Sequence, residues 1–389
     1  MKKLRFDLPY ISPFRFFSIC IFLVLVILLI DKIAFYYVSK DLSQIDYIWN
    51  SIEAKTEVAN QIANIHNRLK NKDYWDIWWP WWVIFSYSFY GYSLVNIYLE
   101  NPLDIKYKTY AQNELVSIYN FLITDWLENF KNKGTKIEHW IIYEWTKNQI
   151  LASLVILGKE EYKKSFYENS DKLEKNLEAS KWYSWESYPS LAWYIDNIHA
   201  YYSLYLADKI RVLDWLPPKY HKLITDWISG MKMAIDKKWI TLAEVYTTEP
   251  ENNQARWCAQ AWLLVYMYEL DRWYFNDQYP KFLDHFYRIK SWFWLVYDVP
   301  DWEELINAFS WWPALFWYSS SATALSLPLF KLTSDKPRYI SILRTLTFLL
   351  DYEKEHWSYT LWYSSLLDSL NLWWKTHVTW WDKLDKVLK

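Results

Sequence analysis

Two carboxylates stand close together in one segment, Glu186 and Asp196, with a turn at Pro189 between them. A turn followed by a helix start can direct both side chains into one cleft, as paired acid and base catalysis requires. Tyr188 lies inside this segment and is a candidate substrate-binding residue, as is His199, which shares a helix face with Asp196. The alternative for Asp196 is a plain helix N-cap. This segment is the strongest candidate site in the sequence.

Asp196 and His199 could also hold a metal, because residues three apart project from one side of a helix. A zinc site needs at least a third ligand, and no second histidine follows at the spacing that zinc sites use. We therefore expect no metal and no cofactor. There is also no glycine-rich phosphate loop and no nucleophile elbow.

A third candidate carboxylate is Glu144, which follows His139 beside an expected helix start. It could act as an acid or base. It could equally stabilise the helix that follows, because the amino end of a helix favours a negative charge. Tyr87, in an aromatic segment over 85–92, could bind substrate or pack in the core.

The segment 251–262 carries polar residues into a helix. Arg256 and Gln260 lie four apart and would project together, a common way to hold an anionic or hydroxyl-rich ligand. Cys258 lies between them and could be a nucleophile or a buried, inert thiol. We include Arg256 and Gln260 among the candidate substrate-binding residues.

Helices must position these side chains, because apolar residues recur at three- and four-residue spacing along the chain. The pattern predicts twelve of them, near 42–70, 83–100, 105–131, 145–157, 160–178, 195–209, 217–236, 254–270, 275–292, 314–330, 335–352 and 360–373. Short extended pieces are expected at 240–246 and 293–299. Six antiparallel pairs with short connections favour an all-α fold of the (α/α)6 toroid type. An extended solenoid is the alternative, although no fixed repeat length is present.

The amino-terminal segment predicts a membrane helix. Basic residues precede an uncharged run from Phe16 to Ile30, and apolar character resumes to Val38, close to the about 20 residues that a bilayer needs. The basic flank places the amino terminus in the cytoplasm. We expect a signal anchor over 1–39 and a toroid domain over 40–389, which makes a single-pass protein of the cell membrane; a cleaved signal peptide is the alternative.

The composition is unusual, with 30 tryptophans and 4 glycines in 389 residues. About 7% glycine usage would give roughly 27. We therefore hypothesise that many tryptophans represent UGA codons that the source reads as glycine. Four tryptophans stand at helical spacing among apolar residues and could be genuine core residues, namely Trp126, Trp215, Trp227 and Trp262. Turn chemistry favours glycine at Trp185, Trp302, Trp311, Trp312 and the four tryptophans around Pro80.

Three segments together, 186–197, 254–262 and 310–317, resemble a family of poorly characterised membrane-anchored α/α-toroid proteins. Their relatives include the linalool dehydratase/isomerase-like group and, more remotely, α/α-toroid glycosidases. The resemblance implies a toroid fold over about 75–330. Terpene dehydration in that group is associated with cysteines as well as an acid, and only Cys258 is available in this region.

Three functions follow as expectations. The first is an enzyme that acts outside the cytoplasm on a glycan or another hydroxyl-rich substrate, with Glu186 and Asp196 as acid and base. The second is a lyase or isomerase of a terpenoid or lipid alcohol, as the resemblance implies. The third is a non-catalytic scaffold at the cell surface. The net charge of −2 shows no basic excess, so no nucleic-acid partner is expected.

Overall fold

The structure is a computed structural model in which most of the helical part of the chain is described. The described residues are 17–27, 29–30, 33, 52–71, 80–124, 139–180, 184–187, 191–235, 239–246, 257–290, 293–296, 314–315, 318–349, 352–353, 358–359 and 364–388.

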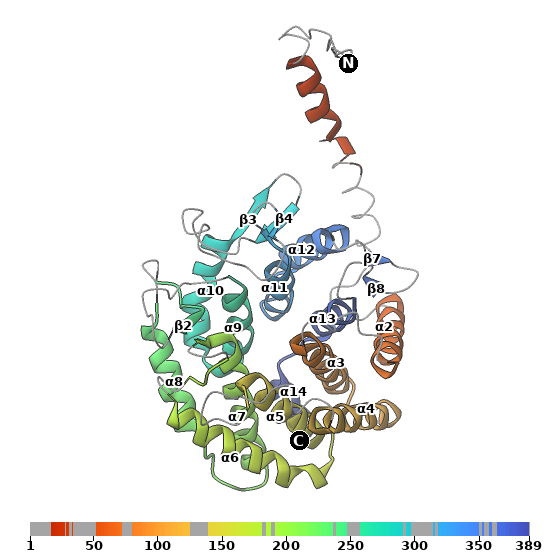
Figure 1. Ribbon diagram of the computed structural model, residues 1–389. Helices are drawn as coiled ribbons and strands as arrows, with labels where there is room; N and C mark the ends of the chain where they lie inside the picture. The colour runs from red at the N-terminus through yellow and green to blue at the C-terminus, as the bar shows by residue number, and fades with distance from the viewer. Residues whose placement is uncertain are drawn as a thin grey trace, which may run out of the picture.

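Six helices of the described chain form a closed inner ring, seen along its axis in Figure 1. Each packs against the next, and the last of them packs against the first, so the ring has no open edge. The inner helices, in ring order, are α3 (Pro80–Glu100), α5 (Ile141–Ile156), α7 (Tyr194–Leu213), α9 (Trp257–Leu270), α11 (Ser320–Leu332) and α13 (Ser364–Thr376).

Six more helices alternate with these along the chain and cover the outside of the ring. They are α2 (Ile52–Lys70), α4 (Ile105–Thr124), α6 (Lys163–Ala179), α8 (His221–Met233), α10 (Arg272–Phe286) and α12 (Lys336–Leu349). A helix of one layer followed by a helix of the other, repeated around a ring, is the (α/α)6 toroid that the sequence predicts.

The two layers differ in their sequence pattern for a physical reason. The outer helix α6 buries one stripe, including Phe166, Leu173 and Leu177, and presents Lys and Glu to solvent. The inner helix α5 is buried almost continuously from Ile141 to Val155, because it has neighbours on every side. A helix that is apolar all round must lie inside the protein, so hydrophobic burial sorts the helices into the two layers.

The two ends of the ring differ in the length of their connections. Inner helices lead into outer helices through the short segments 101–104, 157–162, 214–220, 271 and 333–335. Outer helices lead back into inner helices through the longer segments 71–79, 125–140, 180–193, 234–256, 287–319 and 350–363. We call these the short-connection end and the long-connection end. The amino ends of all six inner helices therefore gather at the long-connection end.

Short strand pairs lie within the long connections. They are β1 (Leu191–Trp193) with β2 (Glu244–Tyr246), β3 (Tyr287–Lys290) with β4 (Phe293–Val296), β5 (Ala314–Leu315) with β6 (Tyr318–Ser319), and β7 (Tyr352–Glu353) with β8 (Ser358–Tyr359), all antiparallel. Strands β2 and β4 confirm the extended pieces expected at 240–246 and 293–299. The others were not predicted, because two or three residues show no alternation.

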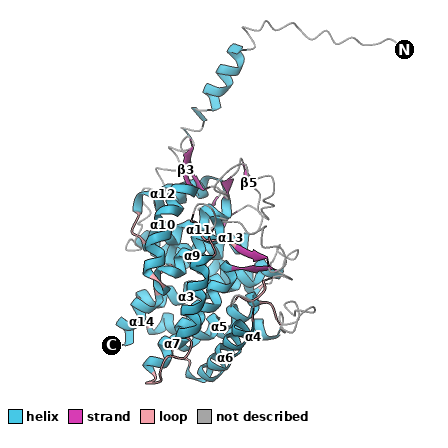
Figure 2. Ribbon diagram, turned by 90° about the vertical axis from the view of Figure 1, so that its left-hand side faces the viewer, coloured by secondary structure: helices cyan, strands magenta, loops and turns pink. Residues whose placement is uncertain are grey.

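A further helix, α14 (Trp380–Leu388), packs on α3 at the short-connection end and lies to one side of the ring in Figure 2. The Glu269 carboxylate, on the last turn of α9, accepts the backbone N–H groups of Trp380 at 2.7 Å and Trp381 at 3.4 Å. It also accepts the Tyr202 hydroxyl at 3.2 Å. The indole nitrogen of Trp380 donates to Asn96 Oδ1 at 2.6 Å. Helix α14 is therefore hydrogen-bonded to two inner helices, α3 and α9.

The predicted membrane helix is wrong. In the described part of the chain, no helix is both long enough and apolar enough to cross a bilayer. The uncharged run from Phe16 ends at Ile30, before Asp31 and Lys32, and is shorter than the about 20 residues a span needs. The expected single-pass placement in the cell membrane is therefore not supported.

Trp215 has a left-handed backbone, with φ of 61°, and an indole that is 95% exposed. It occupies the position after α7 that Gly158, at φ of 85°, occupies after α5 and Ser334, at φ of 58°, after α11. In all three, the next residue donates its N–H to the carbonyl five residues back. This is a Schellman helix end, whose left-handed residue is usually glycine. The expectation that Trp215 packs in a core is wrong.

Candidate functional site

The start of α7 at the long-connection end is held by hydrogen bonds to a segment that precedes it. Asn197 accepts the N–H of Trp185 at 2.8 Å and donates to its carbonyl at 3.1 Å. Asn197 also donates to the Trp193 carbonyl at 2.8 Å. The Ser187 hydroxyl accepts the Trp193 N–H at 3.1 Å. Residues 185 and 187 are thus fixed against the first turn of α7, and Glu186 lies between them.

The segments that carry the two predicted catalytic carboxyls therefore adjoin each other. Asp196 is buried, and burial raises its pKa to about 7, although a hydrogen bond from Ser187 opposes the shift. Its Oδ2 has no hydrogen-bond partner among the described residues, and the same holds for the buried Oε2 of Glu186. Buried carboxyl oxygens are nearly always paired, because desolvation is costly. Two such oxygens on adjoining segments are typical of a functional site.

His199 lies one turn further along α7 and is enclosed by aromatic rings. The imidazole stacks on Trp145 at 4.0 Å between ring centroids and meets the edges of Tyr266 at 4.5 Å and Trp262 at 5.1 Å. Gln149, on α5, contacts its Nδ1 at 3.3 Å. Burial lowers the pKa of His199 well below its usual range, so the ring is neutral. Its Nε2 has no partner among the described residues.

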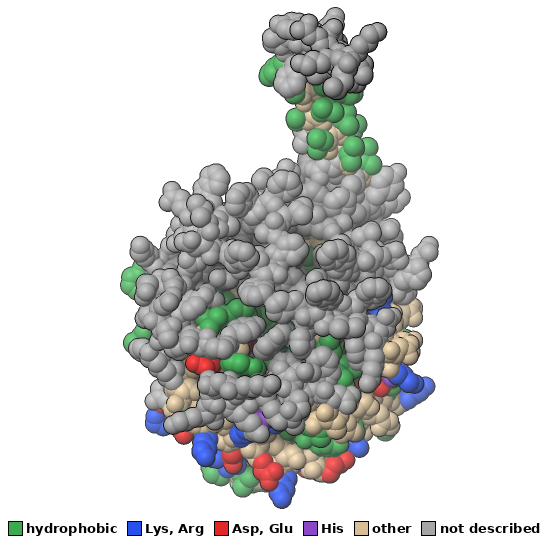
Figure 3. All heavy atoms as spheres, viewed as in Figure 1, with side chains coloured by type: hydrophobic (Ala, Val, Ile, Leu, Met, Phe, Trp, Pro, Cys, Tyr) green, Lys and Arg blue, Asp and Glu red, His purple; other side chains and the backbone are tan. Residues whose placement is uncertain are grey.

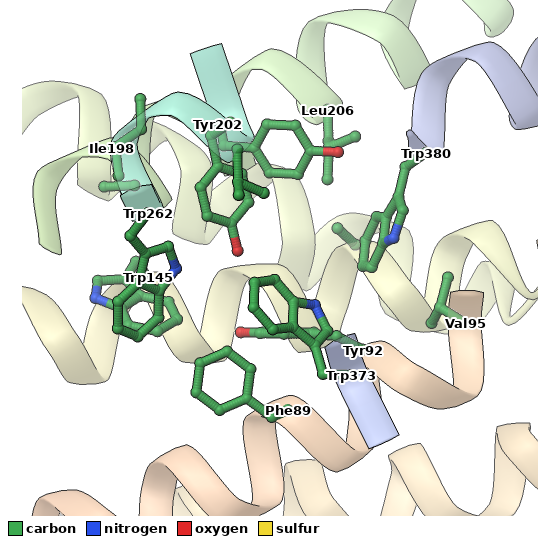
Figure 4. Packing of buried hydrophobic residues seen from close by; sticks show 14 of the residues in the cluster. Phe89, Tyr92, Val95, Trp145, Ile198, Tyr202, Leu206, Trp262, Trp373 and Trp380 are labelled. Atoms are coloured by element: carbon green, nitrogen blue, oxygen red, sulfur yellow. The ribbon is translucent and has the colours of Figure 1, made fainter. Parts of the chain in front are cut away.

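Aromatic side chains from several inner helices fill the inside of the ring. Figure 4 shows Phe89, Tyr202, Trp262 and Trp373 gathered from α3, α7, α9 and α13. The ring centroids of Phe89 and Trp373 are 5.0 Å apart, and those of Phe89 and Trp262 are 5.5 Å apart. The His199 imidazole thus borders a largely apolar interior, and a few polar groups beside apolar side chains are typical of small-molecule sites.

Glu144 is held in a different way. It is buried at the start of α5 and forms ion pairs with Lys172 at 2.7 Å and Lys147 at 3.1 Å, and His139 contacts it at 3.1 Å. These partners outweigh burial and lower its pKa to about 2. A carboxylate held charged by two lysines fits the alternative that the sequence left open, stabilisation of the amino end of α5.

Two predicted substrate-binding residues are engaged in the packing. The Gln260 side chain donates to the Thr241 carbonyl, which ties α9 to the connection that precedes it. The Tyr87 hydroxyl donates to the Leu69 carbonyl at 3.2 Å, which joins α3 to α2. Tyr188 and Arg256 lie outside the described residues, as does the side chain of Cys258.

Two polar residues of the site were not selected from the sequence. Asn197 lies within the candidate segment but was not predicted as a site residue, although its amide determines the course of the segment before α7. Gln149 was overlooked, although Glu144, Asn148 and Gln149 form a polar stripe inside the apolar sequence of α5. Buried polar residues inside such a helix need hydrogen-bond partners, and that signal could have identified Gln149.

Within the described part of the chain, no three His, Cys, Asp or Glu side chains gather as ligands for a metal ion. On the face shown in Figure 3, the described Lys, Arg, Asp and Glu side chains intermingle along one edge. Mixed charge of this kind is typical of an ordinary solvent-exposed surface.

No protein-family model matches this chain, and no curated protein matches it. Among solved structures, the chain is similar to the crystal structure of D-mannose isomerase, with a TM-score of 0.49 and 11% sequence identity. The match covers 75% of this chain and 86% of that one. A likeness this distant identifies no function.

Proposed function

We propose that the protein is an enzyme that acts on a carbohydrate or another hydroxyl-rich substrate by acid and base catalysis at the long-connection end. The observation that carries the proposal is the pair of buried carboxyl oxygens on Glu186 and Asp196 that lack a partner among the described residues. A raised pKa lets Asp196 hold a proton near neutrality, as a general acid must. Glu186 is the base in this assignment.

The neighbouring side chains have supporting roles in the proposal. His199 binds a substrate oxygen, and the aromatic interior excludes water from the acid and base. Tyr188 and Arg256 are proposed to position the substrate, as the sequence predicts. Gln260 supports the wall of the site through Thr241 instead of contacting the ligand. In the same proposal, Glu144 acts through its charge at the start of α5 and Tyr87 through the packing of α3 against α2.

The test compares three variants on a panel of mono- and oligosaccharides in D2O, followed by proton NMR. New reducing ends report hydrolysis, and deuterium bound to carbon reports isomerisation. Asp196→Asn and Glu186→Gln should each lower turnover by about 10²- to 10⁴-fold, the usual contribution of a general acid or base. Asp214→Asn is the matched control, because Asp214 follows the other end of α7 and pairs there with Lys163.

Full turnover in Asp196→Asn and Glu186→Gln would refute the assignment of the acid and base. A folded protein that binds and converts no member of the panel would instead favour the scaffold alternative. The terpenoid alternative predicts turnover of an apolar alcohol that depends on Cys258, which Cys258→Ala tests in the same assay.

We also propose that some of the tryptophans stand for glycine in the native protein. The left-handed backbone of Trp215, at the position that Gly158 takes after α5, supports this. Trp185, also expected to be glycine, is fully buried, and Trp302, Trp311 and Trp312 lie outside the described residues. Peptide masses of the native protein decide the matter, and intact indoles at positions 215, 302, 311 and 312 would overturn the proposal.

A further inference from the structure

The contact between Gln149 and His199 determines which nitrogen of the imidazole carries the proton. Gln149 Nε2 lies 3.0 Å from the His199 backbone carbonyl oxygen and 3.3 Å from the His199 Nδ1. Both side chains are buried, with exposed fractions of 2% for Gln149 and 1% for His199. One amide group therefore contacts both the ring and the backbone of the same residue.

The backbone contact fixes the orientation of the Gln149 amide. A carbonyl oxygen can only accept a hydrogen bond, so the Gln149 group that faces it must be the NH2 group and not the oxygen. The same NH2 group has a second hydrogen, which it directs at Nδ1 of His199. Nδ1 must then be the acceptor nitrogen of the ring.

A neutral imidazole that accepts at Nδ1 carries its proton on Nε2. A doubly protonated ring would place an N–H opposite the NH2 group of Gln149, and two donors would face each other without an acceptor. The aromatic rings of Trp145 and Tyr266 around the imidazole offer no anion to stabilise a positive charge. The neutral form with hydrogen on Nε2 satisfies every contact that the described residues make with this ring.

We propose that Gln149 is a positioning residue that holds His199 as the neutral Nε2–H tautomer, so that His199 donates a hydrogen bond to an acceptor oxygen of the substrate. This rests on the proposed function and deepens it. Nε2 is the ring nitrogen without a partner among the described residues, and Asp196 precedes it by one turn on the same helix. A fixed neutral donor beside a carboxyl group suits a carbonyl, hydroxyl or ring oxygen.

The same argument distinguishes the classes of ligand that His199 Nε2 can and cannot bind. An ammonium or metal cation needs a lone pair from the ring, and an Nε2–H group has none to offer. A donor with a proton at all relevant pH values also recognises oxygen in the same way on either side of neutrality. Asp196 is then the group of this pair whose proton is lost or gained as the pH passes through about 7.

The first test needs no substrate. The protein is labelled with 15N-histidine, and two-bond proton to nitrogen correlations at neutral pH distinguish the protonated from the unprotonated ring nitrogen. His199→Gln assigns the signals of His199 by their loss. We expect the proton on Nε2 in the unaltered protein. A proton on Nδ1, or on both nitrogens, overturns the proposal whatever the fate of the proposed function.

The second test alters Gln149. Gln149→Glu places an acceptor opposite Nδ1, so the proton should move to Nδ1 and turnover should fall by about 10²-fold, the usual effect of losing one donor to a reacting oxygen. Gln112→Glu is the matched control, because Gln112 also donates to a backbone carbonyl, that of Leu157, at the short-connection end. The control should leave the His199 signals and turnover unchanged.

Gln149→Leu covers the case in which the glutamate variant does not fold. It removes the donor without adding charge, so His199 should show a mixture of the two neutral forms. An unchanged Nε2–H signal in Gln149→Leu would show that Gln149 does not determine the tautomer.

Discussion

Each end of the helical ring contains a carboxyl group with a raised pKa, Glu269 at one end and Asp196 at the other, but the two groups make different contacts. At the short-connection end, the half-buried Glu269 accepts three donors at its carboxylate, two of them backbone N–H groups of α14. At the long-connection end, Asp196 is buried and has an oxygen without a partner among the described residues. Burial raises the pKa of both groups to about 7. For these two carboxyls, whose pKa values are alike, hydrogen-bond saturation distinguishes the one that fixes a helix from the candidate catalytic one.

The pH dependence of stability is the largest expected effect. Below about pH 4 Asp196 is protonated in both states, and between about pH 4 and 7 the unfolded chain loses this proton while the folded chain keeps it. The folded state therefore binds more protons, and stability falls as the pH rises through this window, by up to about 4 kcal/mol at 1.36 kcal/mol per pKa unit. Asp196→Asn should flatten this dependence in chemical denaturation measured from pH 4 to 8.

Glu269 should contribute to stability in the same window, so Glu269→Gln should flatten the curve as well. Asp196 and Glu269 should differ in their effect on the pH dependence of turnover. If Asp196 is the acid, turnover declines above about pH 7, and Glu269→Gln leaves that profile in place. A turnover profile that shifts with Glu269→Gln would break the comparison.

Asn197→Ala should have the next largest effect. It removes three hydrogen bonds to the backbone of Trp185 and Trp193, and buried backbone groups without partners cost about 1 kcal/mol or more each, so the free energy of unfolding should fall by about 3 kcal/mol. Turnover should fall too, because Glu186 is no longer held. Asn148→Ala, which also removes buried amide hydrogen bonds, to Ser170 and Ser203, is the control and should lower stability alone.

At the opposite end, Glu269→Ala should lower the free energy of unfolding by about 2 kcal/mol, because it leaves the N–H groups of Trp380 and Trp381 without their acceptor. Glu269→Gln keeps one acceptor oxygen and should cost less. Turnover of correctly folded protein should not change in either variant. Loss of activity here at full stability would mean that the short-connection end takes part in the chemistry.

The smallest effect concerns Trp215 at the end of α7. Trp215→Gly should raise the free energy of unfolding by about 1 kcal/mol, since a left-handed backbone costs a residue with a side chain about that much. Trp273→Gly is the matched control, because this indole is also exposed but lies in the right-handed helix α10. There glycine should lower stability by up to about 1 kcal/mol. Equal signs for the two variants would contradict the role of φ.

Much of the ring could be predicted from the sequence, because apolar periodicity depends on local residue types. Each predicted helix has its counterpart from α2 to α13, within a few residues at many ends and up to about ten at others. The prediction of a membrane helix at the amino-terminal run was wrong because it counted apolar residues on both sides of Asp31 and Lys32, although these two charges end the uncharged run. Helix α14 was missed because it has only 9 residues, and contacts with α3 and Glu269 fix its position.

The candidate site stays a prediction. The segment with Glu186, Asp196 and His199 was selected because polar residues at a helix start are conspicuous in sequence. The contrast between Glu144 and Asp196 was not, because it depends on Lys147 and Lys172 meeting one carboxylate and not the other. The pair with Lys172 follows from the packing of α5 against α6, which no local pattern specifies, whereas Lys147 lies three residues after Glu144 on α5 and its pairing could have been predicted from the spacing.

The closure of the ring has a consequence for how the protein comes apart. Since α13 packs against α3, every inner helix has an inner neighbour on both sides. A solenoid can fray from a terminal repeat and lose its units stepwise. Here the loss of any inner helix would expose apolar flanks on two others at once. We therefore expect the twelve-helix ring to melt in one cooperative transition.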